Sequence, residues 1–280
     1  DSAASGTAMA CGEKTYNGVV GINSKNKQLE SILEYCKSKN FTTALIATSS
    51  IVHATPASFY ANVNSRRQYE DIALQLRYHS VDYFIGGGRK HFNRREDKRD
   101  LIAEMETEGY KIVNNIDNYD GYKNKKIGFF TYADEPPPIN TGRKPSLEVL
   151  VNSTLDKLKS DNKPFFLMVE ASQIDWGGHA NDLPYIISEF KDFNKAISNA
   201  LDFAKLNGNT LIVVTADHET GGLAIKKGNL KKNSVIGDFT TIGHSGTMVP
   251  VFSYGSKSEI FKGIYENTAI FNKLKIAADQ

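Results

Sequence analysis

Three clusters of histidine and carboxylate residues each follow an apolar run that is typical of a β-strand. They lie within residues 169–179, 214–222 and 243–246. Imidazole and carboxylate groups together are the ligands that a catalytic zinc ion requires. Because the carboxyl ends of strands in an α/β sheet open into one crevice, the three clusters predict a single metal-dependent site. A candidate nucleophile, Ser2, stands at the start of a helical pattern.

The first cluster holds Asp175 and His179, which are four residues apart. On a helix or a tight turn they share one face, where they could bind the same metal ion. The alternative is a surface aspartate near a histidine that is hydrogen-bonded for other reasons. Gly177 and Gly178, which lie between the two directly after a buried strand, favour the metal interpretation.

The second and third clusters place histidines in similar positions. Asp217 and His218 end an apolar run, where a turning backbone lets adjacent side chains converge. A helix-capping aspartate beside a hydrogen-bonded histidine is the alternative. His244 lies between glycines in a loop with little else to explain a histidine. The remaining candidates His79 and His91 lack this context, and we interpret them as ordinary surface or helix residues.

Three further side chains could bind an ion or a phosphate. Glu170 ends an apolar strand and needs a partner, because an isolated buried carboxylate is costly; Mg²⁺ and a salt bridge are the two alternatives. Thr55 could add a hydroxyl ligand to that ion or cap a helix that starts at Pro56. Arg66, beside Arg67, could clamp a phosphate or be a solvated charge.

Composition limits the class of protein. The chain has 280 residues, is 40% apolar and 24% charged, and carries a net charge of +2, which argues against specific nucleic-acid binding. It contains no apolar run long enough to predict a membrane span. Cys11 and Cys36 could form a disulfide, although buried thiols are favoured. An aimed nucleophile needs a strand before it, so we expect the sequence to be a fragment that lacks at least one preceding strand.

Strand-like and helical patterns alternate along the chain, which predicts a three-layer α/β sandwich with a mostly parallel central sheet and helices on both faces. We expect one domain over residues 1–280, with surface segments at 114–126 and 134–145. The predicted strands are 42–47, 83–85, 127–132, 165–170, 211–215 and 249–254, and the predicted helices are 5–14, 27–39, 67–79, 95–108, 145–159, 184–206 and 256–277.

Taken together, the motifs resemble those of the alkaline phosphatases from residue 1 to about residue 255. The resemblance implies that Ser2 is a nucleophile that becomes a phosphoserine, that Arg66 clamps the substrate phosphate, and that Asp1 orients Arg66. The matching motifs are Asp1-Ser2-Ala3, Ala54-Thr55-Pro56, Ser65-Arg66, Glu170, Asp175 with His179, Thr215 to Gly222, and Gly243-His244-Ser245-Gly246.

The resemblance also implies three metal sites and two neighbouring side chains. His53 and Trp176 occupy positions that vary in the family, and this pair is similar to certain marine, cold-adapted members. His53 could then contact the third ion through a bridging water, or it could shift the preference of that site toward zinc. The implied ligands are Asp175, His179 and His244 for the first zinc, Asp217, His218 and Ser2 for the second zinc, and Thr55 and Glu170 for a magnesium ion.

The function implied is metal-dependent hydrolysis of small phosphate monoesters with broad specificity at alkaline pH. A phosphodiesterase or sulfatase of the same superfamily, or an inactive metal-binding or phosphate-binding fragment, are the alternatives. The family's further bridging aspartate lies on a strand upstream of the nucleophile, which agrees with the expected missing strand. Homodimers and a periplasmic or secreted location are typical of the family.

Overall fold

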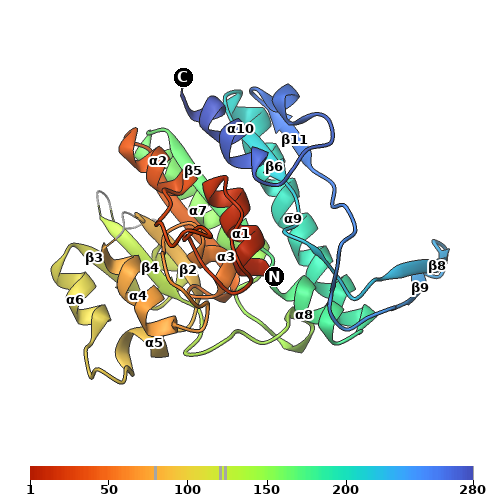
Figure 1. Cartoon of the computed structure of the whole chain (residues 1–280), viewed down its shortest axis with the longest axis horizontal. Helices are drawn as coiled ribbons and strands as arrows, with labels where there is room; N and C mark the ends of the chain where they lie inside the picture. The colour runs from red at the N-terminus through yellow and green to blue at the C-terminus, as the bar shows by residue number, and fades with distance from the viewer. Residues whose placement is uncertain (79–80, 120–121, 123–124, 280) are drawn as a thin grey trace.

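The computed structural model describes residues 1–78, 81–119, 122 and 125–279. His79 and part of the surface segment expected at 114–126 lie outside the described residues, so those two interpretations are not addressed. Figure 1 shows a central sheet with helices packed around it and a hairpin that extends away from the rest of the molecule.

Five parallel strands form the central sheet, in the order β3-β4-β2-β1-β5. In the pairing of β1 with β5, Ala47 lies opposite Glu170, which brings the carboxyl ends of the two strands to the same edge. The prediction of a parallel sheet is confirmed. The strands are β1 Thr42–Ser50, β2 Tyr83–Gly87, β3 Tyr110–Val113, β4 Lys126–Phe130 and β5 Phe165–Glu170.

Alternate side chains of these strands point to opposite faces, and each face is buried. Leu45 and Phe84 belong to one apolar cluster, together with residues of α1 Ser2–Cys11, α2 Ile32–Ser38 and α4 Tyr69–Tyr78. Ile46 and Ile85 belong to the other, which α7 Leu147–Asp161 and α9 Leu183–Asn207 cover. Helices on both faces of the sheet therefore confirm the predicted three layers (Figure 1).

Shorter elements complete the chain. Three antiparallel pairs, β6 with β11, β7 with β10 and β8 with β9, lie outside the central sheet. The pairs are β6 Leu211–Val214 and β11 Phe252–Gly255, β7 Glu219–Thr220 and β10 His244–Ser245, and β8 Ala224–Asn229 and β9 Ser234–Asp238. The remaining helices are α3 Ala54–Ala57, α5 Lys90–Asn93, α6 Leu101–Thr107, α8 Gln173–His179, α10 Ala269–Ala278 and the 3₁₀ turns Ile116–Asn118, Ile139–Thr141 and Ser258–Phe261.

Capping side chains set helix starts that the sequence analysis misplaced. Helix α1 starts at Ser2, earlier than predicted, because Asp1 accepts hydrogen bonds from the free amides of its first turn. Helix α2 starts at Ile32 rather than at residue 27, because Ser31 forms a capping box with Glu34. Helix α6 starts at Leu101 rather than at residue 95, where Asp100 caps it.

The predicted helix over 256–277 and the predicted strand over 249–254 were partly wrong. Gly263, at φ 106°, separates the 3₁₀ turn at Ser258–Phe261 from α10. Strand β11 begins only after Pro250, which has no amide hydrogen to give to a ladder. The four-residue strand β3 was missed altogether.

The two cysteines are not joined to each other, which agrees with the favoured interpretation of buried thiols. Cys11 and Cys36 are free thiols and both are buried. No helix among the described residues is long and apolar enough to cross a membrane.

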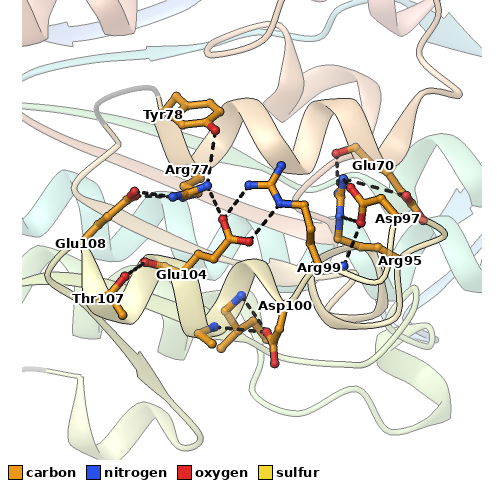
Figure 2. Close-up of polar contacts among 12 residues, drawn as sticks. Glu70, Arg77, Tyr78, Arg95, Asp97, Arg99, Asp100, Glu104, Thr107 and Glu108 are labelled. Carbon is orange, nitrogen blue, oxygen red and sulfur yellow. Dashed lines mark hydrogen bonds and ion pairs between the residues drawn. The ribbon is translucent and has the colours of Figure 1, made fainter.

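A network of arginines and carboxylates joins α4 to α6 (Figure 2), on the side of the sheet where Figure 1 places these two helices. Glu104 accepts hydrogen bonds from Arg99 at 3.0 and 2.6 Å and is paired with Arg77. Arg77 is also paired with Glu108 at 2.5 Å. The side chain of Arg95 is 3% exposed and binds Asp97 at 2.6 Å. None of these side chains belongs to the three histidine clusters. The network joins α4 to α6 and to the segment between α5 and α6.

Candidate metal centre and active site

The histidine clusters occupy the positions that the fold gives to loops and short helices after strands. Helix α8 follows β5, and the segment with Asp217 and His218 follows β6. The two-residue ladder between β7 and β10 brings the distant His244 opposite Thr220. Residue Ser2 lies in the first turn of α1, which contacts α3. The site residues expected from the sequence therefore come from several elements that lie far apart along the chain.

The first group of side chains is Asp175, His179 and His244. Asp175 and His179 lie on α8, and Asp175 Oδ1 is 3.4 Å from His179 Nε2. His244 Nε2 lies 3.4 Å from the same oxygen and 3.0 Å from His179 Nε2. His179 Nδ1 is 2.6 Å from the carbonyl oxygen of Ile242, which can only accept a hydrogen bond. Nδ1 therefore carries the proton, and Nε2 turns a lone pair toward the other two side chains.

The second group is Ser2, Asp217 and His218. The Nε2 atom of His218 is 3.1 Å from Ser2 Oγ and 3.1 Å from Asp217 Oδ2. Ser2 is 6% exposed. Burial acts to raise the pKa of Asp217, but the hydrogen bond and charge of His218 outweigh burial and hold that pKa below its ordinary value. An ionised carboxylate and an imidazole thus flank the buried hydroxyl.

The third group surrounds Glu170. Its carboxylate accepts hydrogen bonds from Ser172 Oγ at 2.6 Å and from Ser49 Oγ at 3.4 Å, and the Thr55 hydroxyl is a further partner. Burial raises the pKa of Glu170 to about 7. Among the residues that the structure describes, these hydroxyl groups are the partners of Glu170, and no lysine or arginine forms an ion pair with it. The sequence analysis did not identify Ser172 and Ser49 as partners of Glu170. The polar residues at the end of the apolar strand β1 were a signal that could have indicated Ser49.

A line of contacts connects the start of α1 with α8. Arg66 Nη1 donates to Asp1 Oδ2 at 3.0 Å, and Arg66 Nη2 lies 3.3 Å from His53 Nε2. The His53 ring meets the Trp176 ring edge-on, with 6.0 Å between centroids. Burial, followed by the charge of Arg66, lowers the pKa of His53 to about 4. His53 is therefore neutral at physiological pH, and Arg66 is held from two sides.

The distances between the ligand atoms of the first group fit those around a bound metal ion. A tetrahedral ion with nitrogen or oxygen ligands at roughly 2.0–2.1 Å separates those ligand atoms by about 3.3 Å. The three distances in the first group are 3.0, 3.4 and 3.4 Å. In addition, the Ile242 carbonyl oxygen occupies Nδ1 of His179, so Nε2 is the ring nitrogen that could bind an ion. Atoms of Asp175, His218 and His244 also lie within 4.8 Å of one another, so the first two groups adjoin.

Two glycines on α8 allow neighbouring elements to approach the first group. A Cβ at Gly177 would lie 2.8 Å from a side-chain carbon of Ile186 on α9. A Cβ at Gly178 would lie 2.8 Å from the carbonyl oxygen and 2.9 Å from the Cβ of Thr220. The glycines between Asp175 and His179 are therefore required by close packing of β7 and α9.

Comparisons with known proteins identify similar chains. The sequence model of the family described as alkaline phosphatase matches residues 1–237. Alkaline phosphatase 3 of Bacillus subtilis is 34% identical over 96% of this chain and 75% of its own length. Alkaline phosphatase 4 of the same organism is 40% identical over 80% of this chain, which spans half of that relative.

Solved structures are similar as well. The alkaline phosphatase from the Antarctic bacterium TAB5 superimposes with a TM-score of 0.93 at 42% identity, covering 99% of this chain and 84% of that one. A variant of the TAB5 protein, His 135 Asp, has Mg bound in a site designated M3 and superimposes with a TM-score of 0.92.

Proposed function

The chain belongs to the alkaline phosphatase family, and we propose that it hydrolyses phosphate monoesters through a phosphoserine formed on Ser2. The observation that carries the proposal is the position of the Ser2 hydroxyl, 3.1 Å from His218 Nε2 and beside ionised Asp217. A buried hydroxyl next to a converging set of metal ligands is suited to attack on phosphorus. Activity at neutral to alkaline pH and broad specificity for small monoesters are part of the proposal.

Metal ions belong to this proposal, and the donor geometry above supports them. Bound zinc and magnesium would lower the pKa of a hydroxyl and neutralise the charge of the transferring phosphoryl group. The residues that would hold them are Asp175, His179 and His244 for one zinc, Asp217, His218 and Ser2 for the second, and Glu170 with Thr55 for magnesium.

The chain's own residues would divide the reaction into two displacements. In the first displacement Ser2 Oγ gives its proton to solvent and forms a bond to phosphorus, while the bond between phosphorus and the leaving oxygen breaks and that oxygen takes a proton from solvent to leave as the alcohol. In the second, water loses a proton and forms a bond to phosphorus from the opposite side, the bond between Oγ and phosphorus breaks, and Oγ regains a proton as inorganic phosphate is released. Asp217 and His218 hold the Oγ atom in place during both displacements.

Arg66 would bind the phosphate oxygens. Its planar guanidinium is oriented by Asp1 at one nitrogen and by neutral His53 at the other, so its remaining N–H donors are held in a fixed direction. A fork of this kind pairs with two unshared phosphate oxygens. A monoester leaves a further unshared oxygen and a second negative charge for the proposed metal ions, which a diester lacks, and this favours monoesters over the phosphodiesterase alternative.

The test is the trapping of the covalent intermediate. Incubation of the zinc- and magnesium-loaded protein with a radioactive aryl phosphate, followed by acid quenching, should label the chain, and Ser2→Ala should remove the label. Undiminished labelling of Ser2→Ala would overturn the role of Ser2. Turnover of aryl phosphate, aryl phosphodiester and aryl sulfate, compared under the same conditions, tests substrate class; faster turnover of the diester or sulfate contradicts the proposal.

Two further proposals rest on family membership alone. We propose a periplasmic or secreted location and a homodimeric assembly. Fractionation of the source cells tests the first, and light scattering of the purified protein tests the second.

A further inference from the structure

A groove lies between α4 and two segments that precede it, residues 22–28 and 62–64, and none of its lining residues belongs to the three groups of proposed metal ligands. Its volume is about 520 Å³, within the range of about 300–1,000 Å³ that is typical of small-molecule sites. The apolar part of the lining is Ile22, Val63 and Leu74. Six carboxamide side chains also line it, namely Asn26, Gln28, Asn62, Asn64, Gln68 and Gln75.

Hydrogen bonds to the backbone fix the orientation of two of these amides. Gln75 Oε1 accepts from the backbone amide of Asn62 at 2.7 Å, and Gln75 Nε2 donates to the carbonyl oxygen of Asn62 at 3.1 Å. The side-chain nitrogen of Asn62 donates to the carbonyl oxygens of Gly21 and Leu29, at 2.5 and 3.2 Å. Asn62 therefore ties the segment that precedes α4 to the loop on the opposite side of the groove.

The hydrogen-bonding capacity that remains in the lining includes both acceptors and donors. Both side-chain N–H groups of Asn62 are used, so its free atom is Oδ1, which is an acceptor. Gln68 and Gln75 each donate one side-chain N–H to a protein oxygen and keep the second one. The exposed side chain of Asn64 makes no hydrogen bond with any other described residue. The groove thus offers polar groups whose directions are largely set before a ligand binds.

The charge and the backbone of the lining argue against other classes of ligand. No lysine, arginine or histidine of the described chain lines the groove, so it lacks the cation that a phosphate or carboxylate ligand requires. Its one carboxylate, Asp71, already accepts a hydrogen bond from a glutamine of the lining, and a single carboxylate is a poor site for a hard cation. An extended peptide would need a free strand edge, whereas Ile22 and Val63 are already paired.

We propose that this groove binds a sugar ring of a neutral saccharide. The hydroxyl groups at the edge of a sugar ring both donate and accept hydrogen bonds, which the carboxamides can return. The C–H groups on its faces fit the apolar part of the lining. Tyr78, which is 61% exposed, adds an aromatic ring on which such a face can stack. The site goes beyond the proposed function, because it requires neither metal ions nor phosphate, and it would attach the chain to a polysaccharide.

Calorimetric titration of the full chain, with zinc and magnesium present, tests the proposal directly. The probes are cellobiose, maltose and N,N′-diacetylchitobiose, which are neutral disaccharides that differ in linkage and in their acetamido groups. We expect at least one of them to bind. Saturating inorganic phosphate should leave this binding unchanged, because the groove contains none of the residues proposed to hold phosphate or metal. Triglycine, a short peptide with amide groups and no hydroxyl groups, should not bind.

Two variants with matched controls locate the binding. Asn64→Ala removes an exposed carboxamide of the lining, and Tyr78→Ala removes the exposed ring. We expect each to weaken saccharide binding by about threefold to tenfold, which corresponds to the loss of one hydrogen bond or one stacked ring. Asn207→Ala and Tyr16→Ala remove exposed side chains of the same types outside the groove and should leave the affinity unchanged. Urea unfolding of each variant shows whether the fold is intact.

Each other outcome overturns the proposal. If none of the three disaccharides binds, the groove is not a saccharide site. If inorganic phosphate abolishes binding, the sugar occupies the proposed phosphate site instead. If triglycine binds as tightly as the best disaccharide, the groove recognises peptide groups. If Asn64→Ala and Tyr78→Ala bind the disaccharide as tightly as their controls do, the sugar lies elsewhere on the surface. None of these results bears on the phosphoserine proposed for Ser2, which is tested by labelling.

Discussion

Arg66 is bound to Asp1 by a hydrogen bond of 3.0 Å between Nη1 and Oδ2, although 65 residues separate the two along the chain. The other carboxylate oxygen of Asp1 accepts from the amides of Ala3 and Ala4 and from the Gly18 amide at 2.8 Å. One side chain therefore both caps the helix that begins with Ser2 and orients the guanidinium proposed to bind phosphate.

Substitutions at Asp1 should separate these two roles. Asp1→Asn keeps an oxygen for the cap but removes the charge that Arg66 faces, and we expect KM for an aryl phosphate to rise roughly tenfold with little loss of stability. Asp1→Ala should raise KM similarly and also lower the free energy of unfolding by about 1 kcal/mol. Steady-state kinetics and urea unfolding measure the two effects. Equal KM values for Asp1→Asn and the unmodified protein would contradict the orienting role.

Binding of magnesium should depend on pH through Glu170. Burial raises the pKa of this carboxyl from 4.5 to about 7, so in the folded, metal-free chain it keeps its proton up to about neutral pH. Its contribution to the stability of the metal-free fold is present below pH 4.5 and is lost as the pH rises through about 7. Since the metal requires the carboxylate, magnesium affinity should fall roughly tenfold per pH unit below that value and level off above it.

Calorimetric titration in buffers of different ionisation enthalpy measures the released proton. We expect Glu170→Gln to abolish both the proton release and the high-affinity magnesium binding. Magnesium affinity that does not change between about pH 6 and about pH 8 would show that Glu170 is already ionised or is not a ligand.

Because α8 and β7 are in close contact at Gly178, we expect a larger side chain there to lower stability and metal binding. A methyl group there would lie 2.8–2.9 Å from Thr220, so Gly178→Ala must displace β7 and with it His244. We expect a loss of about 1–3 kcal/mol in the free energy of unfolding and weaker zinc binding. Gly228→Ala in the exposed strand β8, where the nearest atom would be 3.9 Å away, is the control and should leave both unchanged. Thermal unfolding with and without chelator provides the comparison.

The network in Figure 2 should affect stability without affecting the site. Glu104→Gln removes the carboxylate that Arg77 and Arg99 share. Because these ion pairs are screened by solvent, we expect only a small loss in the free energy of unfolding, which is smaller at high salt than at low salt. Urea unfolding at two salt concentrations measures the effect. A change in turnover of aryl phosphate would show that the periphery is coupled to the site.

The layered fold was predictable from local pattern. The run Phe165–Glu170 was predicted to the residue, because a continuously apolar segment follows Pro164 and ends at a charged side chain. The spacing of Asp175 and His179 indicated a shared helical face, and α8 provides it. Both predictions depend only on residues that lie close together in the sequence.

What the sequence analysis missed depends on distant contacts. The ladder between β7 and β10 contains two residues on each side, too few to produce an alternating pattern, and it exists only because residues far apart in sequence meet. The contacts of Thr220 with Asp175 and His218 could therefore not be predicted from the sequence. Helix α10 was predicted too long, because the apolar pattern continues across Gly263, where the backbone conformation does not.

The arrangement of the site across the chain has a consequence for synthesis. Ser2 and Arg66 leave the ribosome long before His244, whose strand β10 is among the last elements to be made. Since chains are made from the N-terminus, a partly synthesised chain carries the hydroxyl and the guanidinium without a complete set of zinc ligands. The first group of proposed zinc ligands is therefore completed only after β10 has been made and has paired with β7.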